Sequence, residues 1–338
     1  MQPLAPAVDE SADWQRELAL AIRDPVELLH ALGLDPALAE GAAAAHGQFP
    51  LRVPRGYLAR MRPGDPDDPL LRQVLPLGLE MAPAAGFGAD PVGDLEAAQG
   101  AGILHKYQGR VLLVATGACA IHCRYCFRRH FPYADASAGA DRWQAALAYL
   151  AARPEVSEVI LSGGDPLLLS DRRLRVLVDG LQAIPQLKRL RIHSRLPVVL
   201  PQRIDNALLD WLCEGRLQPV MVIHANHAIE LDRSVAQAVG RLRARGVSVL
   251  NQTVLLRAVN DTTASLAALS ERLFAIGALP YYLHLLDKVQ GAAHFEVTID
   301  RARELAAELA ATLPGYLVPK LVQERAGEPN KTLLLPCP

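Results

Sequence analysis

Three cysteines, Cys119, Cys123 and Cys126, are separated by three and then two residues and are well placed to hold a metal centre. Thiolates at this spacing converge on one face of a loop and bind zinc or an iron–sulfur cluster. A closed tetrahedral site needs a fourth ligand, which this loop does not supply as a cysteine. A [4Fe–4S] cluster held by three cysteines therefore keeps one iron free for a small molecule. The alternative is a zinc site completed by His122 or His130.

The spacing CxxxCxxC resembles the cluster loop of radical S-adenosylmethionine (SAM) enzymes. In those enzymes the free iron binds the amino and carboxylate groups of SAM, and an electron from the cluster cleaves the sulfonium to a 5′-deoxyadenosyl radical. The resemblance implies that SAM is a cofactor. Arg128 and Arg129 follow one residue after the last cysteine, and we expect at least one of them to face the substrate.

Short runs rich in Leu and β-branched residues alternate with longer helical segments from residue 111 onward. We expect strands at 111–115, 158–161, 189–193, 219–224, 247–253 and 279–284. We expect helices at 141–152, 171–183, 205–213, 232–245 and 262–276. Since parallel strands need crossover helices, this alternation predicts an α/β fold in which a parallel sheet curls into a partial (βα)6 barrel.

Polar residues follow every predicted strand. In such folds the functional residues lie at the C-terminal ends of the strands, so these residues are expected to share one rim. After the cysteine loop they are Ser162-Gly163-Gly164-Asp165, His193-Ser194-Arg195, the run from His224 to His227, Asn251-Gln252 and Asp287-Lys288.

Two of these groups suggest ligand contacts. Gly163 and Gly164 lack a Cβ and would let backbone approach a ligand, while Asp165 could accept hydrogen bonds from an ammonium group such as that of SAM. Arg195 offers a clamp for a carboxylate or phosphate. The alternatives are a tight turn for the glycines and a surface position for the arginine.

Composition limits the class of protein. The chain has 338 residues and a net charge of -1, which gives no overall field for nucleic acid or an anionic membrane. Residues 1–24 lack the pattern of a signal peptide, no long apolar stretch follows, and three of the five cysteines share one loop, so we expect a cytoplasmic protein without a disulfide framework. Residues 50–100 are rich in Pro, Gly and Asp. We expect a helical and irregular collar at 1–100, the barrel at 101–300, and a C-terminal helix with a cofactor-binding segment at 301–338.

Five motifs together resemble the lysine 2,3-aminomutase family. They lie at 119–130, 162–165, 191–203, 251–261 and 280–295, and the match extends from about residue 50 to the C-terminus. The resemblance implies an isomerase that uses a [4Fe–4S] cluster, SAM and pyridoxal 5′-phosphate (PLP) to convert L-lysine to β-lysine by 2,3-amino migration.

The resemblance also implies that a lysine near the C-terminus forms a Schiff base with PLP. In the family it follows a Gly-Tyr-x-Val-Pro segment, which is present at 315–319, and counting on without gaps reaches Lys331. Lys320 is the rival among only five lysines. The family's glycine-rich run before this lysine is reduced here to Gly327.

Further roles follow from the same resemblance. It implies that Arg128 binds the substrate α-carboxylate, and that Asp287 and Glu324 bind the ε-ammonium, Glu324 standing where the family has a second aspartate. The residues implied around the PLP phosphate and ring are Lys106, Tyr107 and Arg110, and those implied for SAM are Ser162, Gly163, Gly164, Asp165, Ser194, Arg195 and Gln252.

Within the family, segments 51–55, 67–74 and 126–133 resemble the members that make (R)-β-lysine for the modification of translation elongation factor P. Those members end soon after the PLP lysine, and this chain ends seven residues after Lys331. The partners implied are an electron donor of the flavodoxin or ferredoxin type and an elongation factor P lysyl ligase, with a homo-oligomer as a possible assembly. The alternative is a catabolic or osmolyte-producing aminomutase.

Overall fold

The computed structural model describes residues 10–133 and 140–335 of the chain. In this part of the chain nine strands pair in chain order to form one sheet. Strands β2 to β8 are parallel neighbours, whereas β1 and β9 join antiparallel at the two edges. The strands are β1 (Ile103–Tyr107), β2 (Arg110–Thr116), β3 (Glu158–Gly163), β4 (Arg189–Ser194), β5 (Gln218–His224), β6 (Ser248–Val254), β7 (Leu279–His284), β8 (Lys320–Gln323) and β9 (Thr332–Leu333).

Strands β2 to β7 are the six strands expected from the sequence, so the α/β fold with a parallel sheet is confirmed. The sequence patterns did not predict β1, β8 or β9. Strand β8 extends the parallel part of the sheet, and β9 folds back on it as a hairpin. The C-terminal segment is therefore part of the same sheet as the strands that carry the predicted site.

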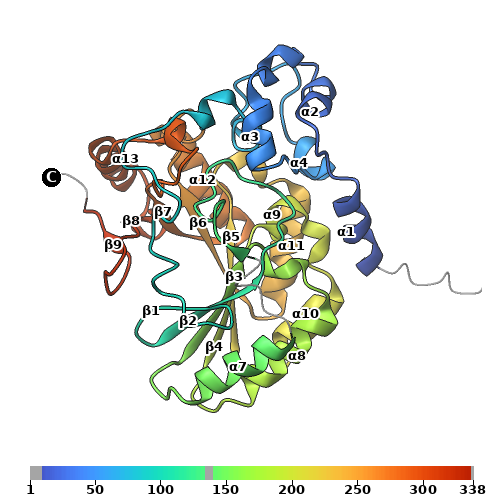
Figure 1. Ribbon diagram of the computed structural model, residues 1–338, viewed down its shortest axis with the longest axis vertical. Helices are drawn as coiled ribbons and strands as arrows, with labels where there is room; N and C mark the ends of the chain where they lie inside the picture. The colour runs from blue at the N-terminus through green and yellow to red at the C-terminus, as the bar shows by residue number, and fades with distance from the viewer. Residues whose placement is uncertain (1–9, 134–139, 336–338) are drawn as a thin grey trace, which may run out of the picture.

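Helices alternate with the strands from β3 onward. Figure 1 shows α8, α10 and α11 along one side of the sheet and the N-terminal helices α2, α3 and α4 beyond the top of the strands. The α-helices are α1 (Glu10–Ala19), α2 (Pro25–Ala31), α3 (Ala42–Gln48), α4 (Arg55–Leu58), α5 (Pro69–Arg72), α7 (Ala140–Ala151), α8 (Asp171–Gln182), α9 (Leu196–Val199), α10 (Asn206–Cys213), α11 (Arg233–Ala244), α12 (Thr263–Ile276) and α13 (Ile299–Thr312). Short 3-10 turns are η1 (Pro36–Ala39), η2 (Gly78–Met81), η3 (Pro166–Leu168), η4 (Pro201–Arg203), η5 (Ala228–Glu230), η6 (Ala293–Phe295) and η7 (Gly315–Leu317).

Helix α11 shows why these segments are helical. The Asp232 side chain caps its first turn by accepting a hydrogen bond from the Val235 backbone N–H. Val235, Ala238, Val239 and Leu242 recur at helical spacing and are all buried. The apolar stripe therefore lies against the sheet, and the opposite face meets solvent.

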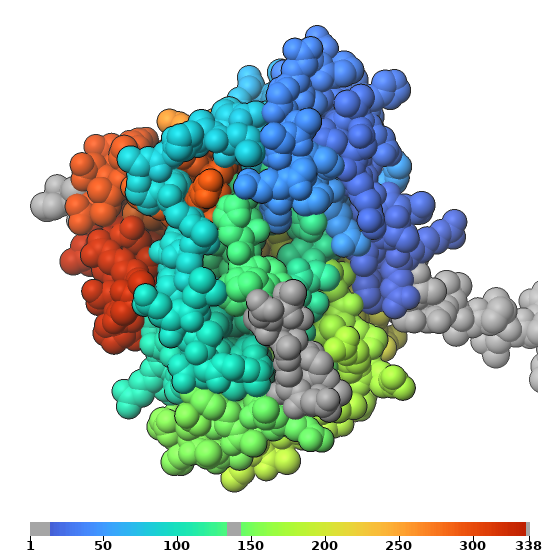
Figure 2. Space-filling model, in the orientation of Figure 1, coloured from blue at the N-terminus to red at the C-terminus, as the bar shows by residue number. Residues whose placement is uncertain are grey.

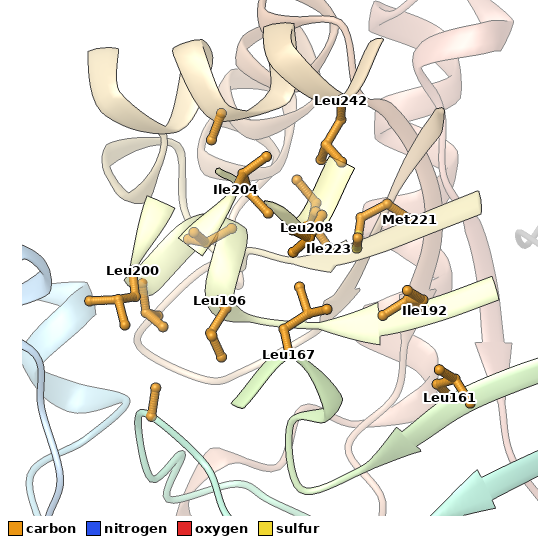
Figure 3. Packing of buried hydrophobic residues seen from close by; sticks show 14 of the residues in the cluster. Leu161, Leu167, Ile192, Leu196, Leu200, Ile204, Leu208, Met221, Ile223 and Leu242 are labelled. Atoms are coloured by element: carbon orange, nitrogen blue, oxygen red, sulfur yellow. The ribbon is translucent and has the colours of Figure 1, made fainter. Parts of the chain in front are cut away.

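The main core lies between the sheet and these helices. Figure 3 shows Ile192 of β4 and Met221 of β5 pointing toward Leu196, Leu208 and Leu242 of the covering helices. Burying each such side chain contributes ~1.5–3 kcal/mol. Since side chains alternate along a strand, the residues between these apolar ones point to the inner side of the curled sheet.

The N-terminal segment packs on the barrel through the same core. Trp14, Leu28 and Tyr57 belong to one hydrophobic cluster with Leu161 and Ile192 of the sheet. The irregular segment that follows, cyan in Figure 2, passes between the blue N-terminal helices and the red C-terminal segment. The division into a collar, a barrel and a C-terminal segment stays a prediction. Among the described residues, no helix is both long and apolar enough to cross a membrane.

Candidate active site

His193, His224, Gln252 and His284 point to the inner side of the sheet near the C-terminal ends of their strands. Paired residues on neighbouring parallel strands share a face, as do alternate residues along a strand. The observed register connects these four residues in this way. The curled sheet therefore gathers polar side chains from β4 to β7 on one inner surface.

The three cysteines lie in the loop after β2, partly shielded from solvent. Burial raises the pKa of the Cys119 thiol, with a further contribution from Cys126, and burial and Cys123 raise the pKa of Cys126 to about 11. Thiols that perturb one another in this way lie close together, and a bound metal centre would hold them as thiolates. The donor set thus fits an iron–sulfur cluster held by three cysteines.

The geometry does not support the zinc alternative. The His122 ring pairs with the Pro50 carbonyl at 2.6 Å, and the His130 ring pairs with the Gln290 carbonyl at 3.2 Å. Among the described residues, no three His, Cys, Asp or Glu side chains gather closely enough to hold a single ion. Cysteine sulfurs around a cubane cluster are spaced more widely than those around one zinc ion, so this finding does not argue against the cluster.

Gly163, the last residue of β3, and Gly164 pack directly against the backbone that leads into the cysteine loop. Gly163 has a φ of +116°, and a Cβ on Gly164 would lie 2.3 Å from the Ala118 carbonyl oxygen. The Gly164 and Asp165 N–H groups donate to the Thr116 and Ala118 carbonyls, both at 2.7 Å. We expected these glycines to admit a ligand, but the space beside Gly164 is filled by the backbone that leads to Cys119.

We predict that Gly164→Ala destabilises the protein by about 1–3 kcal/mol, because the new methyl group overlaps the backbone below the cysteine loop. Iron bound after reconstitution is expected to fall as well. Gly240→Ala is the matched control, since Gly240 lies on an exposed part of α11 with no atom within 4 Å of the added Cβ. That change is expected to stabilise the protein by roughly 0.5–1 kcal/mol. Chemical denaturation and iron analysis measure both effects, and equal behaviour of the two variants would contradict the prediction.

The Asp165 carboxylate joins the ends of β3 and β4. It accepts hydrogen bonds from Ser194 Oγ at 2.7 Å and from the backbone N–H groups of Arg195 at 2.8 Å, Leu167 at 3.1 Å and Leu196 at 3.2 Å. Burial raises its pKa to about 6. We expected Asp165 to receive a ligand ammonium, but its acceptor positions are taken up within the chain.

Arg195 also differs from its expected role as a free clamp. Its Nη1 donates to Cys123 Sγ at 2.7 Å, and its Nη2 contacts Gln73 at 2.7 Å, Glu230 at 3.0 Å and Tyr57 at 3.1 Å. The guanidinium therefore binds a cysteine of the loop and a buried carboxylate at the same time. Both Nη atoms are thus engaged inside the protein, and only the buried Nε has no partner among the described residues.

The remaining predicted residues form a chain of charges that crosses the rim. Arg128 Nε donates to Asp94 at 2.6 Å, and Lys106 Nζ lies 2.6 Å from Asp94 and 3.0 Å from Glu324. Glu324 in turn pairs with Lys331. Although burial opposes it, Lys331 and Lys106 hold the pKa of Glu324 well below its usual range. Asp94, which belongs to the irregular segment, was not predicted as a site residue from the sequence.

Asp287 lies beside this chain of charges. Burial, followed by the nearby Glu324 carboxylate, raises the pKa of Asp287 to about 7, although Lys331 opposes the shift. The structure therefore brings Arg128, Asp287 and Glu324, which the resemblance assigned to the substrate, together with Lys331, which it assigned to PLP. A small pocket opens next to them, lined by Asp94 and Arg128 together with Ala89, Asp90, Leu95, Phe127, His130, Phe131 and Pro132.

Lys331 and Glu324 face each other across the hairpin of β8 and β9. Gln323 pairs with Thr332 at the end of the hairpin, so Glu324 and Lys331 are the first and last residues of the loop and lie opposite each other. Lys331 is 19% exposed, whereas Lys320 at the start of β8 is exposed to solvent. The geometry thus favours Lys331 over its rival as a lysine of the site.

The other predicted residues lie around this group. The Arg110 guanidinium stacks on the Tyr107 ring, with 4.4 Å from the guanidinium carbon to the ring centroid. Burial, followed by the nearby Glu324 carboxylate, raises the pKa of Tyr107. Ser162 Oγ accepts a hydrogen bond from Arg128 Nη1 at 3.3 Å. Gln252 is half-buried on the inner surface, whereas its neighbour Asn251 binds the Ala225 backbone.

Comparison with known proteins gives relatives along nearly the whole chain. The L-lysine 2,3-aminomutase of Escherichia coli strain K12 is 52% identical over 95% of this chain and 94% of its own length. The protein of the same name from Haemophilus influenzae is 50% identical over 98% of both chains. That of Clostridium subterminale is 35% identical over 96% of this chain and 78% of its own. No family model matches. Among solved structures, native anSMEcpe with bound AdoMet has a TM-score of 0.44 and 12% identity, covering 59% of this chain and 57% of that one.

Proposed function

Since the chain belongs to the lysine 2,3-aminomutase family, whose members are isomerases, we propose that it converts L-lysine to β-lysine by moving the amino group from C2 to C3. The observation that carries this proposal is the meeting of Arg128, Asp287, Glu324 and Lys331 at one rim. One cation for a carboxylate, two acids for an ammonium and one amine for a cofactor suit a lysine substrate.

The cofactors proposed are a [4Fe–4S] cluster, SAM and PLP. When bound, the cluster and SAM supply a radical that removes hydrogen from the substrate, and PLP supplies an imine through which nitrogen migrates. Cys119, Cys123 and Cys126 would hold the cluster, and Lys331 would hold PLP, with Lys106, Tyr107 and Arg110 near its phosphate and ring.

For SAM, we propose the rim beside the cysteine loop. Ser162 and Gln252 face its inner side, and Gly163, Gly164 and Ser194 form the strand ends. Asp165 and Arg195 would act by fixing this rim, because their hydrogen bonds tie β3, β4 and Cys123 together.

The charges of the chain explain how substrate lysine would be held. Arg128 is held by Asp94 through Nε and by Ser162 through Nη1, and we propose that its guanidinium also receives the substrate carboxylate at this edge. Glu324 lies between Lys331 and Lys106, and the Asp287 carboxyl lies beside it, so this corner of the site holds two acids. Glu324 and Asp287 then attract the substrate ε-ammonium, which fixes the distance between the two ends of the substrate.

We further propose that the product is (R)-β-lysine and that it serves the modification of elongation factor P in the cytoplasm, together with a lysyl ligase and an electron donor of the flavodoxin or ferredoxin type. Its support is the resemblance of segments 51–55, 67–74 and 126–133 to members with that role. Two of these segments meet the cysteine loop, since Arg52 Nη1 donates to the Cys119 carbonyl and the Arg124 N–H donates to the Gln73 carbonyl at 2.9 Å.

The test is made with anaerobically reconstituted protein, PLP, SAM, a reductant and L-lysine, with products separated by chiral chromatography. Formation of (R)-β-lysine supports the proposal, and supplying the mixture to elongation factor P and its ligase tests the downstream role. Consumption of SAM without any change in lysine would contradict the substrate. Release of β-lysine that the ligase does not use would favour a catabolic or osmolyte-producing role.

We predict that kcat/KM for lysine rises with pH up to about 7 and then levels off, because Asp287 must be ionised to bind the ε-ammonium. Below this pKa the carboxyl is protonated and neutral, so each pH unit is expected to cost about tenfold. Asp287→Asn should be weakly active. The ratio of the wild-type kcat/KM to that of Asp287→Asn at each pH should follow the ionisation of the Asp287 carboxyl. Asp300→Asn, at an exposed carboxylate, should keep the wild-type profile. A wild-type profile parallel to that of Asp287→Asn would refute this role.

A further inference from the structure

Two histidines on the inner surface, His193 on β4 and His284 on β7, have ring nitrogens without a partner. The Nε2 atom of each is buried and makes no hydrogen bond to any residue that the structure describes. By contrast, Nε2 of the nearby His224 pairs with the Tyr125 hydroxyl at 2.8 Å. Native proteins rarely leave buried polar atoms unpaired, so two on one surface indicate that a ligand completes them.

Both histidines lie close to the proposed PLP lysine. Each is within electrostatic reach of Lys331 and Glu324, and His284 also senses His193. Strands β4 and β7 are separated by β5 and β6, so the two rings approach Lys331 from different parts of the curled sheet. A molecule attached to Lys331 would therefore lie within reach of both imidazoles.

Their surroundings keep both rings neutral. Burial lowers the pKa of His193, assisted by Arg191 and Lys331, and burial and Lys331 lower the pKa of His284. A neutral imidazole carries one N–H, which can donate to an anionic oxygen without adding charge. The site already holds the cations of Lys106, Arg128 and Lys331, so a neutral donor suits it better than another cation.

We propose that His193 and His284 bind oxygen atoms of PLP as neutral hydrogen-bond donors through Nε2. The inference rests on the proposed function, because it requires PLP on Lys331. PLP presents two kinds of anionic oxygen, the ring phenolate beside the carbon that Lys331 attacks and the phosphate at the other end. Both rings lie within electrostatic reach of Lys331, so the oxygen we expect them to reach is the phenolate beside the carbon that Lys331 would attack.

The experiment titrates PLP, and separately pyridoxal, into cluster-reconstituted, PLP-free protein without substrate, and follows the Schiff-base absorbance. His193→Phe and His284→Phe remove the donor at similar ring size and are expected to weaken PLP binding about 10- to 100-fold and shift the absorbance maximum. His→Gln variants restore an N–H donor and should recover most of the affinity. His105→Phe is the matched control, because the ring of His105, on β1, pairs with the Tyr149 hydroxyl of α7 at 2.9 Å, so the change should leave PLP binding unchanged.

The outcomes distinguish the phenolate from the phosphate of PLP, and they distinguish failure of this inference from failure of the proposed function. Equal losses for PLP and pyridoxal identify the phenolate, and a loss for PLP alone identifies the phosphate. Phenylalanine variants with wild-type affinity and absorbance would overturn the inference. If either phenylalanine variant does not fold, the corresponding His→Ala variant is tested with and without added imidazole. A PLP affinity that imidazole does not change would also overturn the inference. Wild-type protein that never forms the Schiff base would instead refute the proposed use of PLP.

Discussion

Lys331→Ala is expected to lose the Schiff-base absorbance and to lower aminomutase activity by on the order of 10³-fold or more, because it removes the amine that would hold PLP. Lys331 is only 19% exposed and pairs with Glu324 next to Asp287. Lys106, the other lysine of the site, is engaged with Asp94 and Glu324. Borohydride reduction of the PLP-loaded wild type, followed by peptide mass spectrometry, should place the label on Lys331.

Two further variants separate the covalent role of Lys331 from its charge. Lys331→Arg keeps a cation beside Glu324 but cannot form the imine, so it should fold normally and remain inactive. Lys320→Ala changes an exposed side chain at the start of β8 and should retain PLP and activity. A borohydride label on Lys320 or Lys106, or full activity in Lys331→Ala, would show that the assignment is wrong.

The strands were predictable because they follow simple patterns. Buried parallel strands are rich in apolar residues with polar residues at their ends, and β2, β3 and β5 conform, whereas β4 and β6 alternate buried residues with less buried ones. Strands β8 and β9 show neither pattern, since Lys320–Gln323 is short and begins with lysine and Thr332–Leu333 has only two residues. Their positions come from pairing with β7 and with each other, which no local pattern records.

Contacts between distant residues explain the differences in the site. Arg195 and Asp165 carry the charges expected of ligand-binding residues, yet their partners are Cys123, Glu230 and Ser194 within the chain. The partner of a charged side chain depends on what the fold brings beside it. Asp94 was missed for the same reason, because an aspartate in an irregular segment looks like a turn residue until Arg128 and Lys106 are placed next to it.

Histidine shows the limit of a strand-end argument. The sequence places His193 and His224 at strand ends on equal terms, and His284 is the last residue of a predicted strand. The structure separates them, since His224 is bonded to Tyr125 while His193 and His284 retain unpaired Nε2 atoms. Only the packing around each ring shows which histidines remain available to a ligand.

The buried pair of Arg195 and Glu230 is expected to be the most sensitive point of the fold near the cysteine loop. Glu230 is fully buried and accepts hydrogen bonds from Arg195, Gln73 and the Asn226 backbone at 3.0, 3.2 and 2.8 Å. Glu230→Ala leaves the Arg195 cation buried without its counter-ion, which costs about 3–5 kcal/mol. For a chain of 338 residues the melting temperature should fall by roughly 4–7 °C.

The same change should reach the metal centre, because Arg195 donates to Cys123 Sγ at 2.7 Å. When Glu230 is absent, nothing balances the charge of the guanidinium, and the arginine is expected to move toward solvent and release the cysteine. Iron bound after reconstitution should therefore fall together with the melting temperature. Glu214→Ala is the control, since Glu214 pairs with Arg175 at 3.4 Å with both side chains about half exposed, and it should change stability by no more than about 0.5 kcal/mol. If Glu230→Ala melted and bound iron like Glu214→Ala, the buried pair would not be what positions Cys123.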